Sequence, residues 1–199
     1  MDVKHDVIDG MAYTWVNGVK GTLRRVDYEI LKSIAISIPR GGIYVETGSY
    51  MGCSTVAVGL HVKGGVRVYA HDIWVQDMKD LAAGGAPPPI EKDYFYKFYG
   101  NVIDNNLTNT IIPIRGDSKW SIGIHADNSI DAAFIDGDHS YEGALGDLVA
   151  VWPKLKKGAQ VIIHDCNMPD VMRAVKEFVM ENELDLRGFN DTDMTMFIK

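Results

Sequence analysis

Acidic residues and histidines follow several short apolar runs along this chain of 199 residues. Glu46 and Asp72 each follow one such run, and two denser polar groups follow the runs at 130–135 and 161–163. The two groups consist of Asp136, Asp138 and His139, and of His164, Asp165 and Asn167. Carboxylates, amides and imidazoles gathered at one place can bind a divalent cation, move a proton or hold a cationic ligand.

The two denser groups predict a metal site. If the runs before them are neighbouring parallel strands, the strand ends lie about 5 Å apart and the groups meet. Asp136 and Asp165 are then the expected ligands, with either His164 or Asn167 as the third. Oxygen ligands suit Mg²⁺ or Ca²⁺, whereas an added imidazole admits Mn²⁺. The alternative is that Asp136 contacts an organic cofactor and that Asp165 or Asn167 caps the following helix.

His139 is a candidate catalytic base, because an unperturbed imidazole titrates near neutral pH. Asp136 is the second residue to which we assign a catalytic role, through the cation it would hold. The alternative for His139 is a local structural role before a helix capped by Ser140. His71, directly before Asp72, is expected to be structural.

A glycine-rich turn, VETGSYMGCST at residues 45–55, follows the apolar run at 43–45. It does not have the GxGxxG spacing of a dinucleotide-binding turn, and no lysine follows its second glycine as in a P-loop. Glu46 would oppose phosphate groups, so the turn favours a ligand with a cationic or hydroxyl-rich face. This argues against a nicotinamide dinucleotide, which we keep as an alternative cofactor.

Two further acidic positions extend this ligand site. Asp72 follows the turn at roughly the separation at which an acid hydrogen-bonds a ribose diol. Asp117 and Ser118 follow the run at 111–114 and are placed to reach a base. Together these residues describe a nucleoside that carries positive charge and no phosphates, which S-adenosylmethionine satisfies.

Alternating periodicities predict the elements that position these residues. Apolar residues at helical spacing predict helices over 23–38, 54–62, 94–105 and 141–155 and a fifth beginning at Pro169. Short apolar runs predict strands at 43–45, 66–70, 111–114, 130–135, 161–163, 184–189 and 194–198. Such alternation is typical of a doubly wound α/β fold with a mostly parallel sheet and helices on both faces. The last two strands have no helix between them and are expected to pair antiparallel at one edge.

Composition limits the classes of function. Lys and Arg number 20 against 27 Asp and Glu, a net charge of −7, so a dedicated nucleic-acid binder is not expected. The 2 cysteines form no CxxC pair, and no apolar run reaches the 18 residues of a membrane span. With a polar N-terminus, these features favour a cytoplasmic protein without a membrane partner. Closed symmetric dimers are the commonest assemblies, so a homodimer is the expected oligomer if the chain self-associates.

Four segments, VETGSYMGCST, YAHDIW, FIDGDHSYEG and LKKGAQVIIHD, together resemble the class I S-adenosylmethionine-dependent methyltransferases. More narrowly, the chain is similar to the small O-methyltransferases that include macrocin-type sugar O-methyltransferases and cephalosporin-hydroxylase-like proteins. The resemblance runs from about residue 24 to the C-terminus. It implies a Rossmann-like seven-stranded sheet of strand order 3-2-1-4-5-7-6.

The resemblance also implies roles for individual residues. Gly48, Ser49 and Gly52 would line the methionine part of the cofactor, with Glu46 beneath, and Ser54 matches a small hydroxyl residue of the family. The ribose and adenine would be held by Asp72, Trp74, Asp117 and Ser118. The alternative for Trp74 is an aromatic residue packed in a loop.

The metal-dependent members of the group carry an acid after the fourth strand, which Asp136 matches, and an acid pair or acid and amide after the fifth. Asp165 matches the latter, but the neighbouring positions are His164 and Cys166, which departs from the pattern. The cation would align a hydroxyl of the acceptor and lower its pKa.

We therefore expect one domain over 1–199, with an N-terminal arm at 1–22 and a lid or acceptor-binding loop at 74–100. The expected activity is O-methylation of a small hydroxylated acceptor, either a sugar or a vicinal diol, with S-adenosylmethionine as methyl donor. Mg²⁺ is the expected cation, with Mn²⁺ or Ca²⁺ as alternatives. The alternatives are an inactive cofactor-binding protein of the same fold and a nicotinamide-dependent oxidoreductase. For the arm and the loop, the alternative is ordinary packing or a subunit contact.

Overall fold

The computed structural model describes residues 1–74 and 94–199. The strands are β1 (Val3–Ile8), β2 (Met11–Val16), β3 (Val19–Gly21), β4 (Ile43–Thr47), β5 (Arg67–Asp72), β6 (Ile111–Arg115), β7 (Ile130–Ile135), β8 (Leu155–Ile163), β9 (Arg187–Gly188) and β10 (Thr195–Ile198). The α-helices are α1 (Arg25–Ser37), α2 (Cys53–Gly59), α4 (Tyr94–Asp104), α5 (Ser118–Ser121), α6 (Tyr141–Val151) and α7 (Pro169–Glu181). Two 3₁₀ turns, η2 (Ile122–Ile124) and η3 (Trp152–Lys154), complete the elements.

The main sheet has seven strands in the order β6-β5-β4-β7-β8-β10-β9. This is the order 3-2-1-4-5-7-6 in chain sequence, so the expected topology is confirmed. β4 pairs in parallel with β5 and β7, and β8 pairs in parallel with β7. β10 is antiparallel to both β8 and β9. The carboxyl ends of β4, β5, β6, β7 and β8 therefore lie at one edge of the sheet, where such folds bind ligands.

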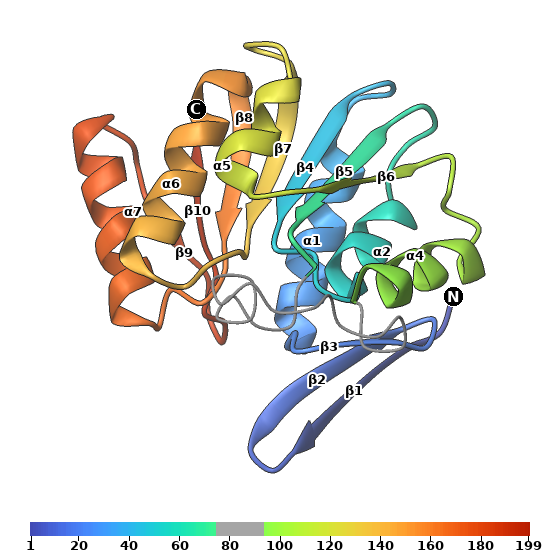
Figure 1. Cartoon of the computed structure of the whole chain (residues 1–199). Coiled ribbons are helices and arrows are strands. Elements are labelled where there is room, and N and C mark those ends of the chain that lie inside the picture. The colour runs from blue at the N-terminus through green and yellow to red at the C-terminus, as the bar shows by residue number, and fades with distance from the viewer. Residues whose placement is uncertain (75–93) are drawn as a thin grey trace, which may run out of the picture.

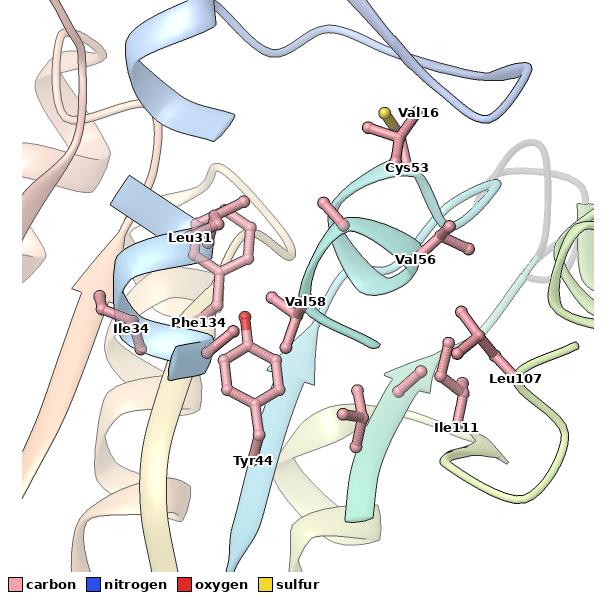
Figure 2. Packing of buried hydrophobic residues seen from close by; sticks show 14 of the residues in the cluster. Val16, Leu31, Ile34, Tyr44, Cys53, Val56, Val58, Leu107, Ile111 and Phe134 are labelled. Atoms are coloured by element: carbon pink, nitrogen blue, oxygen red, sulfur yellow. The ribbon is translucent and has the colours of Figure 1, made fainter. Parts of the chain in front are cut away.

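Alternate residues of each strand enter two separate apolar layers. On β4, Tyr44 packs with α1, α2 and α4, whereas Val45 packs with α6 and α7 on the other face. Figure 1 shows the sheet between these helices, and Figure 2 shows Tyr44 and Phe134 packed against Leu31 and Ile34 of α1. Both faces are covered, which explains why the strands read as nearly continuous apolar runs.

Residues 1–22 form a separate three-stranded antiparallel sheet, β1-β2-β3, below the α/β core in Figure 1. Val16 and Val19 join the core, and the Cys53 thiol at the start of α2 donates to the carbonyl of Thr14 at 3.4 Å. The prediction of an arm did not include these strands. The signal was present in the Asp9-Gly10 and Asn17-Gly18 pairs, which have positive φ at both residues and are the favoured two-residue hairpin turns.

Two predicted boundaries were wrong. Leu155 begins β8 rather than ending a helix, because α6 stops at Val151 and η3 intervenes. Of the strand predicted at 184–189, only Arg187–Gly188 is assigned as a strand, and it pairs with Met196 and Thr195 of β10.

Within 1–74 and 94–199, no helix is long and apolar enough to cross a membrane. Residues 75–93 of the predicted loop at 74–100 lie outside the described residues. Its end, 94–100, is the start of α4.

Candidate active site

The glycine turn between β4 and α2 is shaped by close neighbours within the protein. Gly48 has φ +80°, and a Cβ there would lie 1.9 Å from the carbonyl oxygen of Asp136. Gly52 has φ +87°, and a Cβ there would lie 2.9 Å from the Phe98 ring. Both glycines are therefore required by packing, and the turn lies directly against the end of β7.

Glu46 is fully buried beneath α2, as a residue at the end of β4 that shares a face with Tyr44. Its Oε1 accepts hydrogen bonds from Ser54 at 2.8 Å and Thr55 at 2.6 Å, and its Oε2 has no partner among the described residues. Burial raises the pKa of Glu46 to about 7, against the lowering effect of the neighbouring hydroxyls of Thr55, Ser54 and Ser49. An orphaned buried carboxylate oxygen is costly unless a donor or cation meets it.

Two other buried hydroxyls at the end of β4 and on the glycine turn make no hydrogen bond of ordinary geometry within the described part of the chain, Thr47 Oγ1 and Ser49 Oγ. Ser49 lies close enough to Glu46, and Thr47 close enough to Asp147, to lower the pKa of each carboxyl. Ser49 lies on the glycine turn and Thr47 ends β4. The end of β4 thus carries unused hydrogen-bonding capacity, which suits a polar ligand.

Asp72, at the end of β5, binds the backbone of two segments. One carboxylate oxygen accepts from the Tyr50 N–H at 2.7 Å and the other from the Trp74 N–H at 2.6 Å. Burial raises the pKa of Asp72, while these backbone donors oppose the shift. Trp74 is buried against Phe95 and Phe98 and donates its indole N–H to the Tyr50 carbonyl at 2.8 Å. In this arrangement Trp74 is a packed aromatic residue, and Asp72 holds the backbone of Tyr50 and Trp74 in place beside the end of β5.

Asp117 and Ser118 begin α5, directly after β6. Asp117 is its N-cap and accepts from the Lys119 N–H at 3.0 Å. Ser118 Oγ donates to Oδ1 of Asp147, a residue of α6 that is 2% exposed. Gly116 donates its N–H to the carbonyl of Asp72 at 2.9 Å, which places Asp117 beside the end of β5.

Asp136, His139 and Asp165 come together at the ends of β7 and β8. Each offers one ligand atom, and these atoms lie within 4.8 Å of one another. His139 Nε2 is 3.0 Å from Asp165 Oδ2 and 3.9 Å from Asp136 Oδ1. His164 Nδ1 is 3.1 Å from Asp136 Oδ1 and 3.2 Å from Asp165 Oδ2. The structure therefore brings His139, expected as a base, into the predicted metal-binding group.

The same contacts shift the titration of these groups. Hydrogen bonds to Asp136 and Asp165 raise the pKa of His139 to about 10. Burial lowers the pKa of His164, but the neighbouring carboxylates outweigh it and raise the pKa to about 12. The two imidazoles hold the pKa of Asp165 well below its usual range. In this ion-paired cluster the carboxylates favour the protonated form of both imidazoles, which opposes proton acceptance by His139.

Asn167 and Asp138 lie apart from this cluster. Asn167 is exposed, and the N-cap of α7 is Met168, which makes no side-chain cap, so neither Asp165 nor Asn167 caps that helix. Asp138 accepts from both the N–H and the hydroxyl of Ser140. Ser140 caps α6 by accepting from the Gly143 N–H at 3.0 Å, as expected.

The sequence analysis missed three residues of the site. Thr55 bonds Glu46, Asp147 accepts from Ser118, and the buried Asp27 of α1 lies 3.7 Å from His164 Nε2. Asp147 and Asp27 are acidic residues at buried positions of amphipathic helices. That placement is a usable signal, because a carboxylate on the buried face of a helix requires a polar partner.

Residues 45–166 match the family model described as a methyltransferase domain. This stretch is more than half of the chain and contains the glycine turn and the Asp136–His139–Asp165 cluster. The chain belongs to this methyltransferase family. The resemblance drawn from the sequence motifs is confirmed, and the protein is a methyltransferase. None of the curated proteins matches the sequence significantly.

Solved structures share the fold of the methyltransferase. The O-methyltransferase NovP has a TM-score of 0.70 at 17% identity, covering 90% of this chain and 81% of that chain. A putative caffeoyl-CoA O-methyltransferase from Staphylococcus aureus has a TM-score of 0.69 at 13% identity, covering 90% and 85%. The O-methyltransferase from Bacillus cereus, in complex with SAH, has a TM-score of 0.63 at 15% identity, covering 89% and 82%. At these identities the likeness concerns the fold.

Proposed function

We propose that this methyltransferase transfers a methyl group from S-adenosylmethionine to a hydroxyl of a small acceptor, either a sugar or a vicinal diol, with the help of a divalent cation. The observation that carries the cofactor assignment is Glu46, a fully buried carboxylate with one unpartnered oxygen under the glycine turn. A cationic ligand with amine donors suits this position better than a dinucleotide, whose phosphates Glu46 would repel.

The residues present fit such a cofactor along the strand ends. Glu46 and Ser49 would meet the methionine part, beside Gly48, Gly52 and Ser54. Asp72 would meet the ribose, with its carboxylate already fixed by two backbone donors. Asp117 and Ser118 would meet the adenine. Asp136, adjacent to the Gly48 turn, would lie between the cofactor and the acceptor.

The cluster at the ends of β7 and β8 fits a divalent cation. Ligand atoms at about 2.1 Å from one octahedral ion are about 3 Å apart when adjacent and about 4.2 Å apart when opposite. The 3.0 and 3.9 Å separations of His139 from the two carboxylates lie in this range. Asp136 and Asp165 would hold the ion, with His139 or His164 as a nitrogen ligand that favours Mn²⁺ over Mg²⁺ and Ca²⁺. When bound, the ion would lower the pKa of an acceptor hydroxyl and fix its direction.

The proposed role of His139 as the catalytic base depends on this ion. Asp136 and Asp165 raise the pKa of His139 to about 10, so the free imidazole is a minor species at neutral pH. Since both carboxylates would be shared with the cation, their hold on the imidazolium would weaken. With His164 as the nitrogen ligand, His139, 45% exposed at its side chain, would be open to the acceptor and able to take its proton; with His139 as the ligand, it would not act as the base.

The acceptor pocket is proposed to lie beside Tyr50 and Tyr94, whose rings are 4.7 Å apart at the rim of the glycine turn. The segment 74–100, which includes Tyr94, would contribute to it. The sheet of residues 1–22 contacts the start of α2 and is the second proposed contributor.

Turnover tests the activity. S-adenosylmethionine is incubated with the protein, Mn²⁺ or Mg²⁺ and a panel of sugars, catechols and aliphatic vicinal diols, and S-adenosylhomocysteine formation is measured. Acceptor-dependent product that disappears with EDTA supports the proposal. Cofactor binding without turnover on any acceptor would favour the inactive cofactor-binding alternative. Binding of NADH in place of S-adenosylhomocysteine would favour the oxidoreductase.

A further inference from the structure

The short helix α5 is held to the core by a serine hydroxyl near each end. Its four residues include none that is buried. Ser118 Oγ donates to Asp147 Oδ1, and Ser121 Oγ lies 2.8 Å from His71 Nδ1. These two polar contacts hold α5 to the core, together with the fully buried Ile122 that follows it.

The contact with Asp147 also fixes the direction of the Ser118 hydroxyl. A serine hydroxyl has one hydrogen to donate and two lone pairs to accept with. An ionised carboxylate only accepts, so the single hydrogen of Ser118 is directed towards Asp147. For any other partner, Ser118 Oγ is then an acceptor and not a donor.

Asp147 lies among elements of the site, which explains its burial. It is 2% exposed, and a Cβ at Gly137, after β7, would lie 2.7 Å from its Oδ2. This second oxygen makes no hydrogen bond of ordinary geometry among the described residues, and the Thr47 hydroxyl beside it lowers the pKa of the carboxyl against the raising effect of burial. A buried carboxylate is a costly way to anchor a loop, since an amide or an apolar side chain would cost less. Its charge and accepting character therefore point to a role beyond packing.

Ser118 is positioned to meet the base of a nucleoside. β6 pairs with β5 so that Arg115 is opposite Asp72, and Ser118 follows three residues later. If Asp72 meets the ribose, as proposed above, the base extends towards Asp117 and Ser118. The exocyclic group at position 6 of the purine ring is an amine in adenine and a carbonyl in hypoxanthine. An acceptor complements the amine and opposes the carbonyl.

We propose that Asp147 determines the base specificity of the cofactor site, by holding the Ser118 hydroxyl as an acceptor that selects the 6-amino group of adenine. Asp147 is a positioning residue, since it acts through Ser118. The inference rests on the proposed use of S-adenosylmethionine and names a residue outside the motifs that identify the family.

The test compares two ligands that differ at position 6 of the purine and, as a consequence, at N1, which accepts in adenine and carries a hydrogen in hypoxanthine. Any contact to N1 is common to all variants, so the change in preference between variants isolates the part that depends on Ser118. Calorimetry measures the Kd of S-adenosylhomocysteine and of S-inosylhomocysteine for the wild type, Asp147→Asn, Ser118→Ala and the double variant. The wild type is expected to prefer the adenine ligand by about tenfold to a hundredfold, because the wrong group would face an unmatched acceptor. In Asp147→Asn the carboxamide can turn its N–H₂ towards Ser118 and free the hydroxyl to donate. The preference should therefore fall to about threefold or less.

Two features separate this role from a purely structural one. Ser118→Ala should lose the same preference, and the double variant should lose no more than either single change, because both act on one hydroxyl. Ser129→Ala removes another hydrogen-bonded serine hydroxyl, one that donates to the Ala126 carbonyl, and should keep the wild-type preference. Ser118→Ala lies on an exposed helix and keeps the test valid if Asp147→Asn fails to fold.

An unchanged preference in a folded Asp147→Asn or in Ser118→Ala would overturn the inference, even if both ligands bind more weakly. That result leaves the proposed function standing, because S-adenosylhomocysteine still binds. If the wild type binds neither ligand, the proposed function fails and the inference fails with it.

Discussion

Glu46 illustrates how one residue carries two kinds of information. Its place in the motif predicted a cofactor contact, whereas its titration also depends on hydrogen bonds from Ser54 and Thr55 in the first turn of α2. Because burial raises its pKa to about 7, the free protein holds Glu46 close to its midpoint at neutral pH. A cationic ligand would shift the carboxyl towards its ionised form.

Cofactor binding should therefore release protons. At pH 7 we expect about half a proton per S-adenosylmethionine bound, since a group at its midpoint is half protonated. Calorimetry in two buffers of different ionisation enthalpy measures this number, and Glu46→Gln should reduce it to near zero. Equal binding enthalpies in both buffers for the wild type would argue against a titrating Glu46.

The cation site gives a second prediction at the level of single residues. Asp165→Asn and Asp136→Asn should each weaken Mn²⁺ binding by about a hundredfold, because each removes a charged ligand from the cluster. Electron paramagnetic resonance of free Mn²⁺ gives the affinity directly. Asp138→Asn is the matched control, since the Asp138 carboxylate is bonded to Ser140, and it should bind Mn²⁺ as the wild type does. Wild-type affinity in Asp165→Asn would contradict this assignment.

Among the elements, the turn between β4 and α2 depends most strongly on a single residue. At Gly48, positive φ coincides with a site where an added Cβ would lie 1.9 Å from the Asp136 carbonyl oxygen, whereas a Cβ at Gly41, with φ +72°, would have nothing within 4 Å. Gly48→Ala should lower the free energy of unfolding by about 3–5 kcal/mol, from backbone strain plus overpacking. Gly41→Ala should cost about 1 kcal/mol, from the backbone alone. Urea denaturation measures both, and equal losses would show that the contact with β7 is not the dominant cost.

The link between β5 and η2 predicts a pH dependence of stability. His71 Nε2 and His125 Nε2 lie 3.0 Å apart, with Tyr69 against His125 and Ser121 against His71. Burial, aided by the charge of His125, lowers the pKa of His71 to about 3, and burial together with Lys154 lowers that of His125.

In the unfolded chain His71 would titrate near 6.5, so between about pH 6.5 and 3 the unfolded state binds the extra proton. The stability that His71 contributes is therefore complete above pH 6.5 and is lost as the pH falls, at up to about 1.4 kcal/mol per pH unit. His71→Gln should show a shallower decline than the wild type in urea denaturation between pH 7 and pH 4.5. If the free energy of unfolding of the wild type and of His71→Gln declines in parallel, His71 is not the cause of the pH dependence.

For the whole molecule, the question is how the N-terminal sheet joins the α/β core. Gly21 of β3 lies so close to Cys53 that an added Cβ would be 2.5 Å from the cysteine Cβ. Burial raises the pKa of the Cys53 thiol to about 12, so this thiol should resist alkylation while the sheet is in place.

Gly21→Ala should lift the sheet from α2 and increase the alkylation rate of Cys53 by about tenfold or more. Mass spectrometry of the labelled peptides distinguishes Cys53 from the buried Cys166, whose protection should not change. Gly188→Ala adds the same methyl to β9, where nothing lies within 4 Å, and should leave both thiols protected. Protection of Cys53 in Gly21→Ala would show that the sheet tolerates the methyl group.

The order of strands and helices along the chain could be predicted because it is encoded locally, in the apolar runs of the strands and the helical spacing between them. The order of the strands within the sheet followed from the resemblance to the family, since local periodicity does not specify which strands are neighbours. The contacts that tune the site could not be predicted in this way, because they join distant positions. Asp27 reaches His164 from α1, and Asp147 reaches Ser118 from α6. The place of His139 within the acidic cluster likewise depends on how two strand ends are spaced in three dimensions.

The most direct measurement of the central claim is a calorimetric titration of the protein with S-adenosylhomocysteine, with NADH as the competing ligand. Our account predicts one S-adenosylhomocysteine per chain at micromolar Kd and no measurable NADH binding. It also predicts that Asp72→Ala weakens the affinity by about tenfold or more, through loss of a ribose contact. Absence of S-adenosylhomocysteine binding, or tighter binding of NADH, would contradict it.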